Sequence, residues 1–201
     1  GIDNPRVITS TEALNFQTLP AEIVIIGAGV IGMEFASIFS RFGAKVSVIE
    51  YLKECLPVID KDIAKRVRKQ IEKLQGVTFY MDSAVKAIND NEVVFVSNKN
   101  GKATRLECPA CPVLIATGRK PNIEGLNLEA AGVEYSPKGI TVNDNMLTSV
   151  PHIYAIGDVT GRQMLAHAAT FMGFRAVNAI VGKADKIRFD IMPSAIFTYP
   201  E

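Results

Sequence analysis

The stretch from Glu22 to Glu50 constrains the fold more than any other part of the chain. Its first apolar run, residues 23–26, is rich in β-branched side chains and predicts a buried strand. The sequence GAGVIG at 27–32 follows at once and leads into apolar residues spaced by three and four, which predict a helix. The run Val-Ser-Val-Ile at 46–49 predicts a second strand, which Glu50 ends. This strand–turn–helix–strand order indicates the first β-α-β unit of a dinucleotide-binding sheet.

Each glycine of the turn has a physical role in that interpretation. Gly27 permits the tight turn, Gly29 lets a pyrophosphate approach the backbone, and Gly32 lets the helix pack closely on the strand. The first N–H groups of the helix and its dipole then favour the phosphates. Glu50 can accept hydrogen bonds from both ribose hydroxyls and repels a 2′-phosphate, so it favours NAD over NADP. The alternative is a glycine-rich turn in another kind of α/β protein.

The following residues complete an α/β fold with a parallel sheet and an antiparallel β-meander. A helix over 60–76 and a strand over 77–80 extend the unit to β-α-β-α-β. Three short strands joined by Asn-rich turns are predicted at 84–88, 92–97 and 102–107, too close together to enclose helices. The apolar run 113–116 should return to the parallel sheet.

The chain divides into four predicted segments. Residues 1–11 are expected to be a linker, 12–118 an NAD-binding Rossmann-like domain, 119–188 a partial second segment, and 189–201 the start of a further domain. In the second segment we expect a short helix near 128–131 and strands near 140–142 and 152–156. A helix from about Gln163 to Val181, apolar nearly all round, should be buried between layers.

Composition excludes several function classes. The 201 residues carry a formal net charge of +1, which gives no electrostatic case for nucleic acid or an anionic membrane. No apolar run is long enough to span a membrane, and the start lacks the pattern of a signal peptide. Because the sequence starts at Gly1 without an initiator Met, we expect it to be a segment of a longer protein. Three cysteines in such a chain favour a reducing compartment, and we expect a cytoplasmic location.

Six motifs, in order, carry a family resemblance: GAGVIGME at 27–34, VIE at 48–50, ATGRKPN at 116–122, YAIGDV at 154–159, MLAHAA at 164–169 and PSAIFTYPE at 193–201. Together they resemble the flavin-dependent pyridine nucleotide–disulfide oxidoreductases over nearly the whole chain. Within that family they are most similar to the dihydrolipoyl dehydrogenases. The motif ATGRKPN followed by YAIGD is a specific part of this resemblance to the family.

The resemblance implies roles for individual positions. NAD would be held by Gly27, Gly29, Val30, Gly32 and Glu50, with Val85 and Gly118 flanking the same site. FAD would meet Asp158 at its ribityl chain and the helix start Met164, Leu165, Ala166 and His167 at its ring. Glu34 is the catalytic candidate, because it matches a carboxylate beside the nicotinamide that pairs with a lysine near the flavin. NADP-using relatives carry an aromatic gate at position 30 and arginines after the second strand, whereas this chain has Val30 and only Lys53.

Several family features lie outside this chain. The first FAD fingerprint, the Cys-x4-Cys redox pair, the lysine partner of Glu34 and the domain with the catalytic His and Glu are not in the sequence. The resemblance therefore implies the middle part of a homodimeric parent enzyme, in which dihydrolipoamide or another dithiol reduces FAD and FAD reduces NAD. Such a parent can belong to a 2-oxoacid dehydrogenase complex. This chain alone should be inactive and should not retain FAD. The alternatives are another flavin disulfide reductase or NADH oxidase, or a non-catalytic NAD-binding module.

The motif Cys108-Pro109-Ala110-Cys111 also needs an interpretation. A CxxC pair can be a redox centre or half of a zinc site. A zinc site needs two further ligands, and only Cys55, His152 and His167 are available, at scattered positions. We expect structural thiols at a strand junction and no metal site, with redox activity and metal binding left open.

Overall fold

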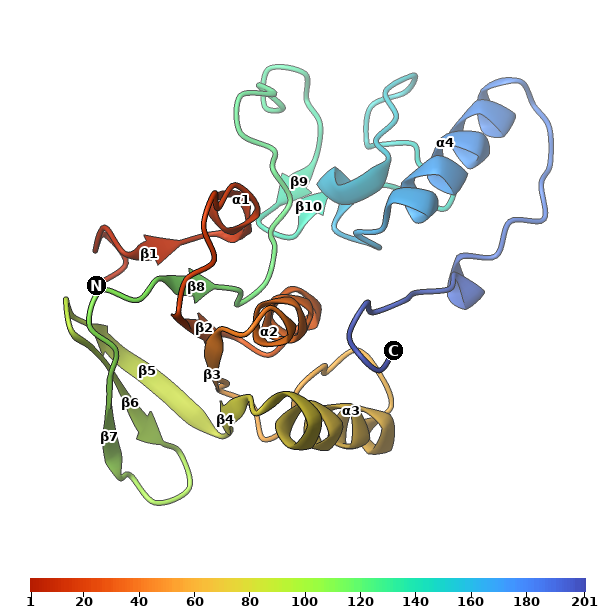
Figure 1. Ribbon diagram of the computed structural model, residues 1–201. Helices are drawn as coiled ribbons and strands as arrows, with labels where there is room; N and C mark the ends of the chain where they lie inside the picture. Colours follow the sequence, from red (N-terminus) through yellow and green to blue (C-terminus); the bar gives the residue numbers. More distant parts are fainter. The chain divides into compact units, whose positions relative to one another are not determined.

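The computed structural model describes all 201 residues, which form two compact units (Figure 1). Unit 1 comprises residues 1–118 and 196–201, and unit 2 comprises residues 119–195. The glycine-rich stretch therefore lies wholly in unit 1.

A five-stranded parallel sheet forms the centre of unit 1 (Figure 1). Its strands in spatial order are β1 (Val7–Ile8), β8 (Val113–Ile115), β2 (Glu22–Ile26), β3 (Lys45–Ile49) and β4 (Thr78–Tyr80). The predicted parallel sheet is confirmed, including the return of β8 beside β2, where Ile25 pairs with Leu114.

Both faces of this sheet are buried, which explains why its strands are apolar at consecutive positions. Ile23 and Ile25 pack on the side of the helices, whereas Val24 packs on the opposite side beneath the meander. Successive side chains of a strand point to opposite faces, so a strand covered on both sides needs apolar residues throughout.

Two helices cover one face of the sheet. Helix α2 (Val30–Arg41) buries Met33 and Phe39, and helix α3 (Lys61–Gln75) buries Ile71 in the same cluster. The side chain of Asp60 accepts hydrogen bonds from the first backbone N–H groups of α3, and a left-handed Gly76 ends it. The short helix α1 (Ser10–Leu14) begins with a capping box.

The predicted meander is confirmed as a separate three-stranded antiparallel sheet (Figure 1). Its strands are β5 (Ser83–Ile88), β6 (Glu92–Ser97) and β7 (Ala103–Glu107). Phe95 and Val93 from β6 pack into the cluster that closes the second face of the parallel sheet. The chain leaves the meander at Cys108 and enters β8.

Both ends of the chain differ from the prediction. Residues 1–11 are not a linker, because Val7 and Ile8 pair with Val113 and Leu114 as the edge strand β1. Residues 196–201 group with unit 1 and form no strand. The N–H groups of Phe197 and Tyr199 donate to side chains of α2 instead of a strand ladder. At the N-terminal end, a strand of two residues is too short to show a periodic pattern in the sequence. At the C-terminal end, residues 196–201 do not pair with any strand of this chain.

Unit 2 has less regular structure than predicted. It contains β9 (Tyr135–Ser136), β10 (Gly139–Ile140), the 3₁₀ helices η1 (Gly157–Thr160) and η2 (Phe189–Ile191), and helix α4 (Ala166–Ile180). Residues 128–131 form hydrogen-bonded turns instead of a helix, and 152–156 contribute a single bridge, Leu147 with Tyr154.

Helix α4 is not buried on all sides. Met172 and Ala176 pack into the core of unit 2, but the side chains of Phe174, Val177 and Ile180 are more than half exposed. The prediction of burial all round is therefore wrong within this chain. No helix combines the length and the apolar character needed to cross a bilayer.

Candidate nucleotide-binding site

The glycine-rich turn lies where two neighbouring strands of the parallel sheet end. Gly27 follows β2 and has φ +104°, a left-handed conformation that favours glycine. A Cβ on Gly27 would come within 2.5 Å of the carbonyl oxygen of Ala116, the residue after β8. The chain runs from β2 to β3 on one side, and β8 lies on the other side of β2. Ligands of open α/β sheets bind at such a switch point, beyond the carboxyl ends of the strands.

Gly32 and Gly29 have opposite surroundings. A Cβ on Gly32 would lie 2.0 Å from the carbonyl oxygen of Gly27, so only glycine lets α2 approach the turn this closely. Gly29 has an ordinary φ of −73°, and a Cβ there would meet no atom within 4 Å. The fold itself therefore requires glycine at position 32 but not at position 29. The open space at Gly29 is what a close ligand would need.

The start of α2 offers unused donors. Gly29 is the N-cap residue, and no side chain caps this helix. The first N–H groups of a helix have no partner within it, and together with the helix dipole they favour an anion. Helix α3, by contrast, has its first N–H groups capped by Asp60. The start of α2 fits a diphosphate.

Glu50 connects the end of β3 to the glycine-rich turn. Its carboxylate accepts hydrogen bonds from the N–H of Ala28 and, at 2.7 Å, from the N–H of Leu52, and the residue is 8% exposed. A carboxylate has about four lone-pair sites, so each oxygen can accept one more bond. Sequence reasoning identified Glu50 but missed Ala28 and Leu52, because backbone donors leave no residue-type signal.

The other four predicted site residues of unit 1 lie in different parts of its structure. Val30 is the first residue of α2 and packs partly against the core. Gly118 lies beyond β8, exposed, with φ +132°. Val85 belongs to β5 in the meander and is partly buried. Glu34, in the second turn of α2, accepts a hydrogen bond of 3.0 Å from the N–H of Phe197.

The predicted flavin residues all lie in unit 2. Asp158 is exposed within η1, after a left-handed Gly157. Met164 and Leu165 precede α4, which has no side-chain cap, and Ala166 begins it. Nε2 of His167 lies 2.7 Å from the carbonyl oxygen of Pro193. The predicted flavin residues therefore lie in η1 and at the start of α4, and all of them belong to unit 2.

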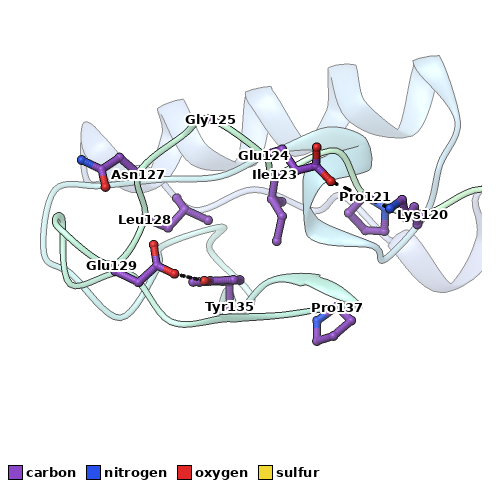
Figure 2. A pocket seen from close by; sticks show the side chains of 10 residues that line it. All are labelled: Lys120, Pro121, Ile123, Glu124, Gly125, Asn127, Leu128, Glu129, Tyr135 and Pro137. Atoms are coloured by element: carbon purple, nitrogen blue, oxygen red, sulfur yellow. Dashed lines mark hydrogen bonds and ion pairs between the residues drawn. The ribbon is translucent and has the colours of Figure 1, made fainter.

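Unit 2 also has a surface hollow of about 600 Å³ (Figure 2). Tyr135 and Glu129, which form a hydrogen bond, line it together with Leu128 and Ile123. Lys120 and Glu124 form an ion pair of 3.9 Å at its edge, with both side chains more than four-fifths exposed. None of the predicted site residues lines this hollow.

The cysteine pair lies in unit 1, buried, and neither thiol is in a disulfide. No cluster of three or more His, Cys, Asp or Glu side chains that could hold a metal ion is present. The guanidinium of Arg6 contacts both cysteines, with Nη1 donating to the carbonyl oxygens of Cys108 at 2.8 Å and Cys111 at 3.2 Å. Sequence reasoning missed Arg6.

Comparisons with known proteins agree with this architecture. Residues 1–173 match the family model described as pyridine nucleotide-disulphide oxidoreductase. Curated relatives include "Dihydrolipoyl dehydrogenase 3" of Haloarcula marismortui, 40% identical over 100% of this chain and 43% of the relative, and "Dihydrolipoyl dehydrogenase" of Bacillus subtilis, 40% identical over 99% of this chain and 43% of the relative. This chain thus spans less than half the length of these relatives.

Solved structures of flavoprotein disulfide reductase RclA and of LpdA resemble this chain over nearly its whole length. The Cu(II) complex of the HOCl-induced flavoprotein disulfide reductase RclA from Escherichia coli has a TM-score of 0.82 and 30% identity, covering 98% of this chain and 45% of that one. LpdA from Mycobacterium tuberculosis has a TM-score of 0.82 and 26% identity, covering 96% and 41%. The sheet, the glycine-rich turn and the family match lead to one conclusion: the chain belongs to the pyridine nucleotide-disulphide oxidoreductase family.

Proposed function

We propose that unit 1 is the NAD-binding unit of a flavin-dependent dihydrolipoyl dehydrogenase. One observation carries the proposal: the backbone at Gly29 faces open space beside the uncapped start of α2. A diphosphate placed there accepts hydrogen bonds from the N–H groups of the first helical turn. The names of the relatives from Haloarcula marismortui and Bacillus subtilis support the choice within the family.

Glu50 gives this unit its preference for NAD. The free lone pairs of its carboxylate accept the two hydroxyls of the adenosine ribose, while Ala28 and Leu52 hold the carboxylate in place. A 2′-phosphate would bring two like charges close to the buried carboxylate, which is unfavourable. Val30 leaves the helix start without an aromatic side chain, and Val85 and Gly118 flank the same site.

In the parent enzyme, bound NAD supplies the hydride acceptor and FAD the hydride donor. In this proposal Asp158 binds the ribityl chain of FAD, and the helix start at Met164, Leu165, Ala166 and His167 faces its ring. The uncapped N-terminus of α4 stabilises negative charge there. The chain contains no second glycine fingerprint for the ADP half of FAD. We therefore propose that it binds NAD, does not retain FAD and has no turnover of its own.

Glu34 is proposed to border the nicotinamide path in the parent. In this chain its carboxylate instead accepts the N–H of Phe197 in the tail. The parent's substrate would be dihydrolipoamide or another dithiol, its state a homodimer, and its assembly a 2-oxoacid dehydrogenase complex. The three unpaired cysteines support a reducing, cytoplasmic location.

A second candidate function is a flavin disulfide reductase with another substrate. The similarity to RclA, a flavoprotein disulfide reductase, favours this candidate. The residues that precede this segment in the parent distinguish the two, because a Cys-x4-Cys pair there supports the lipoamide type. Both candidates share the NAD site.

The proposed preference for NAD predicts a measurable difference between the affinities of the chain for NADH and for NADPH. We expect the chain to bind NADH at least about tenfold more tightly than NADPH, which corresponds to about 1.4 kcal/mol. Glu50→Gln removes the negative charge and one hydrogen-bond acceptor, so the ratio of NADH affinity to NADPH affinity should fall towards one. Fluorescence titration with both nucleotides measures it.

A matched variant controls for general effects of losing a carboxylate. Glu72→Gln removes an acidic group on α3, where Glu72 pairs with Arg68 at 2.8 Å, away from the glycine-rich turn. The NADH to NADPH ratio of this variant should equal that of the unmodified chain. Equal affinities for the two nucleotides in the unmodified chain would refute the role of Glu50.

A further inference from the structure

The turn between β7 and β8 brings two thiols together. Cys108 and Cys111 are its first and last residues, and the N–H of Cys111 donates to the carbonyl oxygen of Cys108 at 3.3 Å. Pro109 is its second residue and Ala110, with φ +57°, its third, which is the pattern of a type II turn. Such turns hold their end Cα atoms within about 7 Å, and disulfides span Cα distances of about 4.4–6.8 Å. The backbone is therefore already close to what a disulfide requires.

The side chains of the pair point to the same place. Nη1 of Arg6 lies 3.3 Å from Sγ of Cys108 and 3.7 Å from Sγ of Cys111. Burial raises the pKa of the Cys111 thiol to about 12, and a hydrogen bond with the Cys108 thiol contributes to the increase. The two sulfur atoms are thus neighbours that share one guanidinium.

Nothing in the proposed NAD site uses these thiols. The pair has no third His, Cys, Asp or Glu ligand beside it, and the positive charge of the Arg6 guanidinium opposes a bound metal cation. The remaining chemistry of two adjacent thiols is oxidation. We propose that Cys108 and Cys111 are a redox-active dithiol, which a two-electron thiol oxidant such as diamide or a low-molecular-weight disulfide converts to an intramolecular disulfide.

Both cysteines are buried, and Cys111, at 6% exposed against 0% for Cys108, is the more accessible residue, so the steps are written with Cys111 reacting first. With diamide, the Cys111 thiolate adds to the N=N bond and forms an S–N bond. The Cys108 thiolate then attacks that sulfur, the S–S bond forms and the S–N bond breaks. The hydrazine leaves with the two protons and two electrons that the thiols lose.

Cys55 provides a matched control within the same unit. It is 1% exposed, and burial raises the pKa of its thiol to about 12, as at Cys111. Its sulfur contacts the carbonyl oxygen of Ala64 at 3.4 Å and has no thiol beside it. Cys55 therefore matches Cys108 in burial and Cys111 in the pKa of its thiol but lacks a partner thiol, so a faster loss of the pair than of Cys55 under oxidant reports on the pair.

The test treats the reduced, folded chain with diamide, quenches with an alkylating agent and maps the thiols by mass spectrometry. We expect a Cys108–Cys111 disulfide that forms at least about tenfold faster than Cys55 is lost and that dithiothreitol reverses, because a neighbouring thiol acts at high effective concentration. Cys55→Ser should leave the disulfide unchanged, and Cys111→Ser should abolish it.

Two results would overturn the proposal. Three titratable thiols after treatment would show that the pair is inert in the folded chain. Loss of Cys55 at the same rate as the pair would show that the oxidant reports unfolding. Circular dichroism during the reaction confirms that the chain stays folded, and Cys55→Ser keeps the test available if Cys111→Ser does not fold.

Discussion

Gly32→Ala is expected to destabilise unit 1 by about 3 kcal/mol and to remove NADH binding, because overpacking that moves backbone costs about 1–3 kcal/mol or more. The new Cβ would lie 2.0 Å from the carbonyl oxygen of Gly27 and 3.0 Å from its carbonyl carbon. Both atoms belong to the backbone, so the contact is relieved only if α2 moves away from the turn. The start of α2 and the glycine-rich turn could then no longer bind the same diphosphate. Chemical denaturation gives the free energy of unfolding, and NADH titration gives the affinity.

A substitution at Gly43, just beyond the end of α2, separates crowding from backbone strain. At Gly43 a Cβ would meet nothing within 4 Å, but its φ of +96° disfavours a side chain. Gly43→Ala should therefore cost only about 1–2 kcal/mol of backbone strain and leave NADH affinity unchanged. A Gly32→Ala chain with unaltered stability and affinity would show that α2 does not need to approach the turn.

Arg6→Met is expected to destabilise unit 1 by about 3 kcal/mol, since hydrogen bonds from charged groups contribute about 1.5–3 kcal/mol each and their loss leaves acceptors unpaired. Besides the two cysteine carbonyls, Nη2 of Arg6 donates to the carbonyl oxygens of Asn89 and, at 2.8 Å, Glu92. One guanidinium thus joins the segment before β1, the β5–β6 turn and the β7–β8 turn. Methionine keeps the apolar stem and removes every donor.

The matched control is Arg105 of β7, an arginine with an exposed side chain. Arg105 is 71% exposed and pairs with Glu92 at 2.5 Å. Arg105→Met should change the free energy of unfolding by less than about 1 kcal/mol, because exposed ion pairs contribute little. If the two variants unfold at the same denaturant concentration, Arg6 does not link these segments.

The central sheet could be predicted because its strands carry the signal themselves. Residues 23–26 are apolar at every position and residues 46–49 at all but the buried Ser47, which fits strands covered on both faces. Strand β1 could not be predicted, since its two residues are fixed by pairing with β8, more than a hundred positions away in the sequence. Local pattern contains no information about such a partner.

Helix α4 shows a different limit. An apolar pattern on all sides predicts burial, but Phe174, Val177 and Ile180 face solvent in this chain. In this chain, which spans 43% of the length of the relatives from Haloarcula marismortui and Bacillus subtilis, only one side of α4 packs into the core of unit 2. The apolar residue types of α4 therefore did not predict which of its side chains are buried in this chain.

The candidate site was predictable to the extent that glycines and a terminal carboxylate mark it. Gly27, Gly32 and Glu50 have contacts that explain their residue types. The contact of Arg6 with Cys108 joins residues 102 positions apart and has no motif. The donors to Glu50 are backbone groups, which any residue type supplies.

The most direct test of the account is NADH titration of Gly29→Ala beside a measurement of its stability. A Cβ at this position meets no protein atom and the φ of −73° suits alanine, so the free energy of unfolding should change by less than about 1 kcal/mol. The same Cβ would occupy the space of the diphosphate, so NADH affinity should fall at least about tenfold, or about 1.4 kcal/mol. Unchanged NADH affinity in a stably folded Gly29→Ala chain would contradict the proposal that this turn binds the nucleotide.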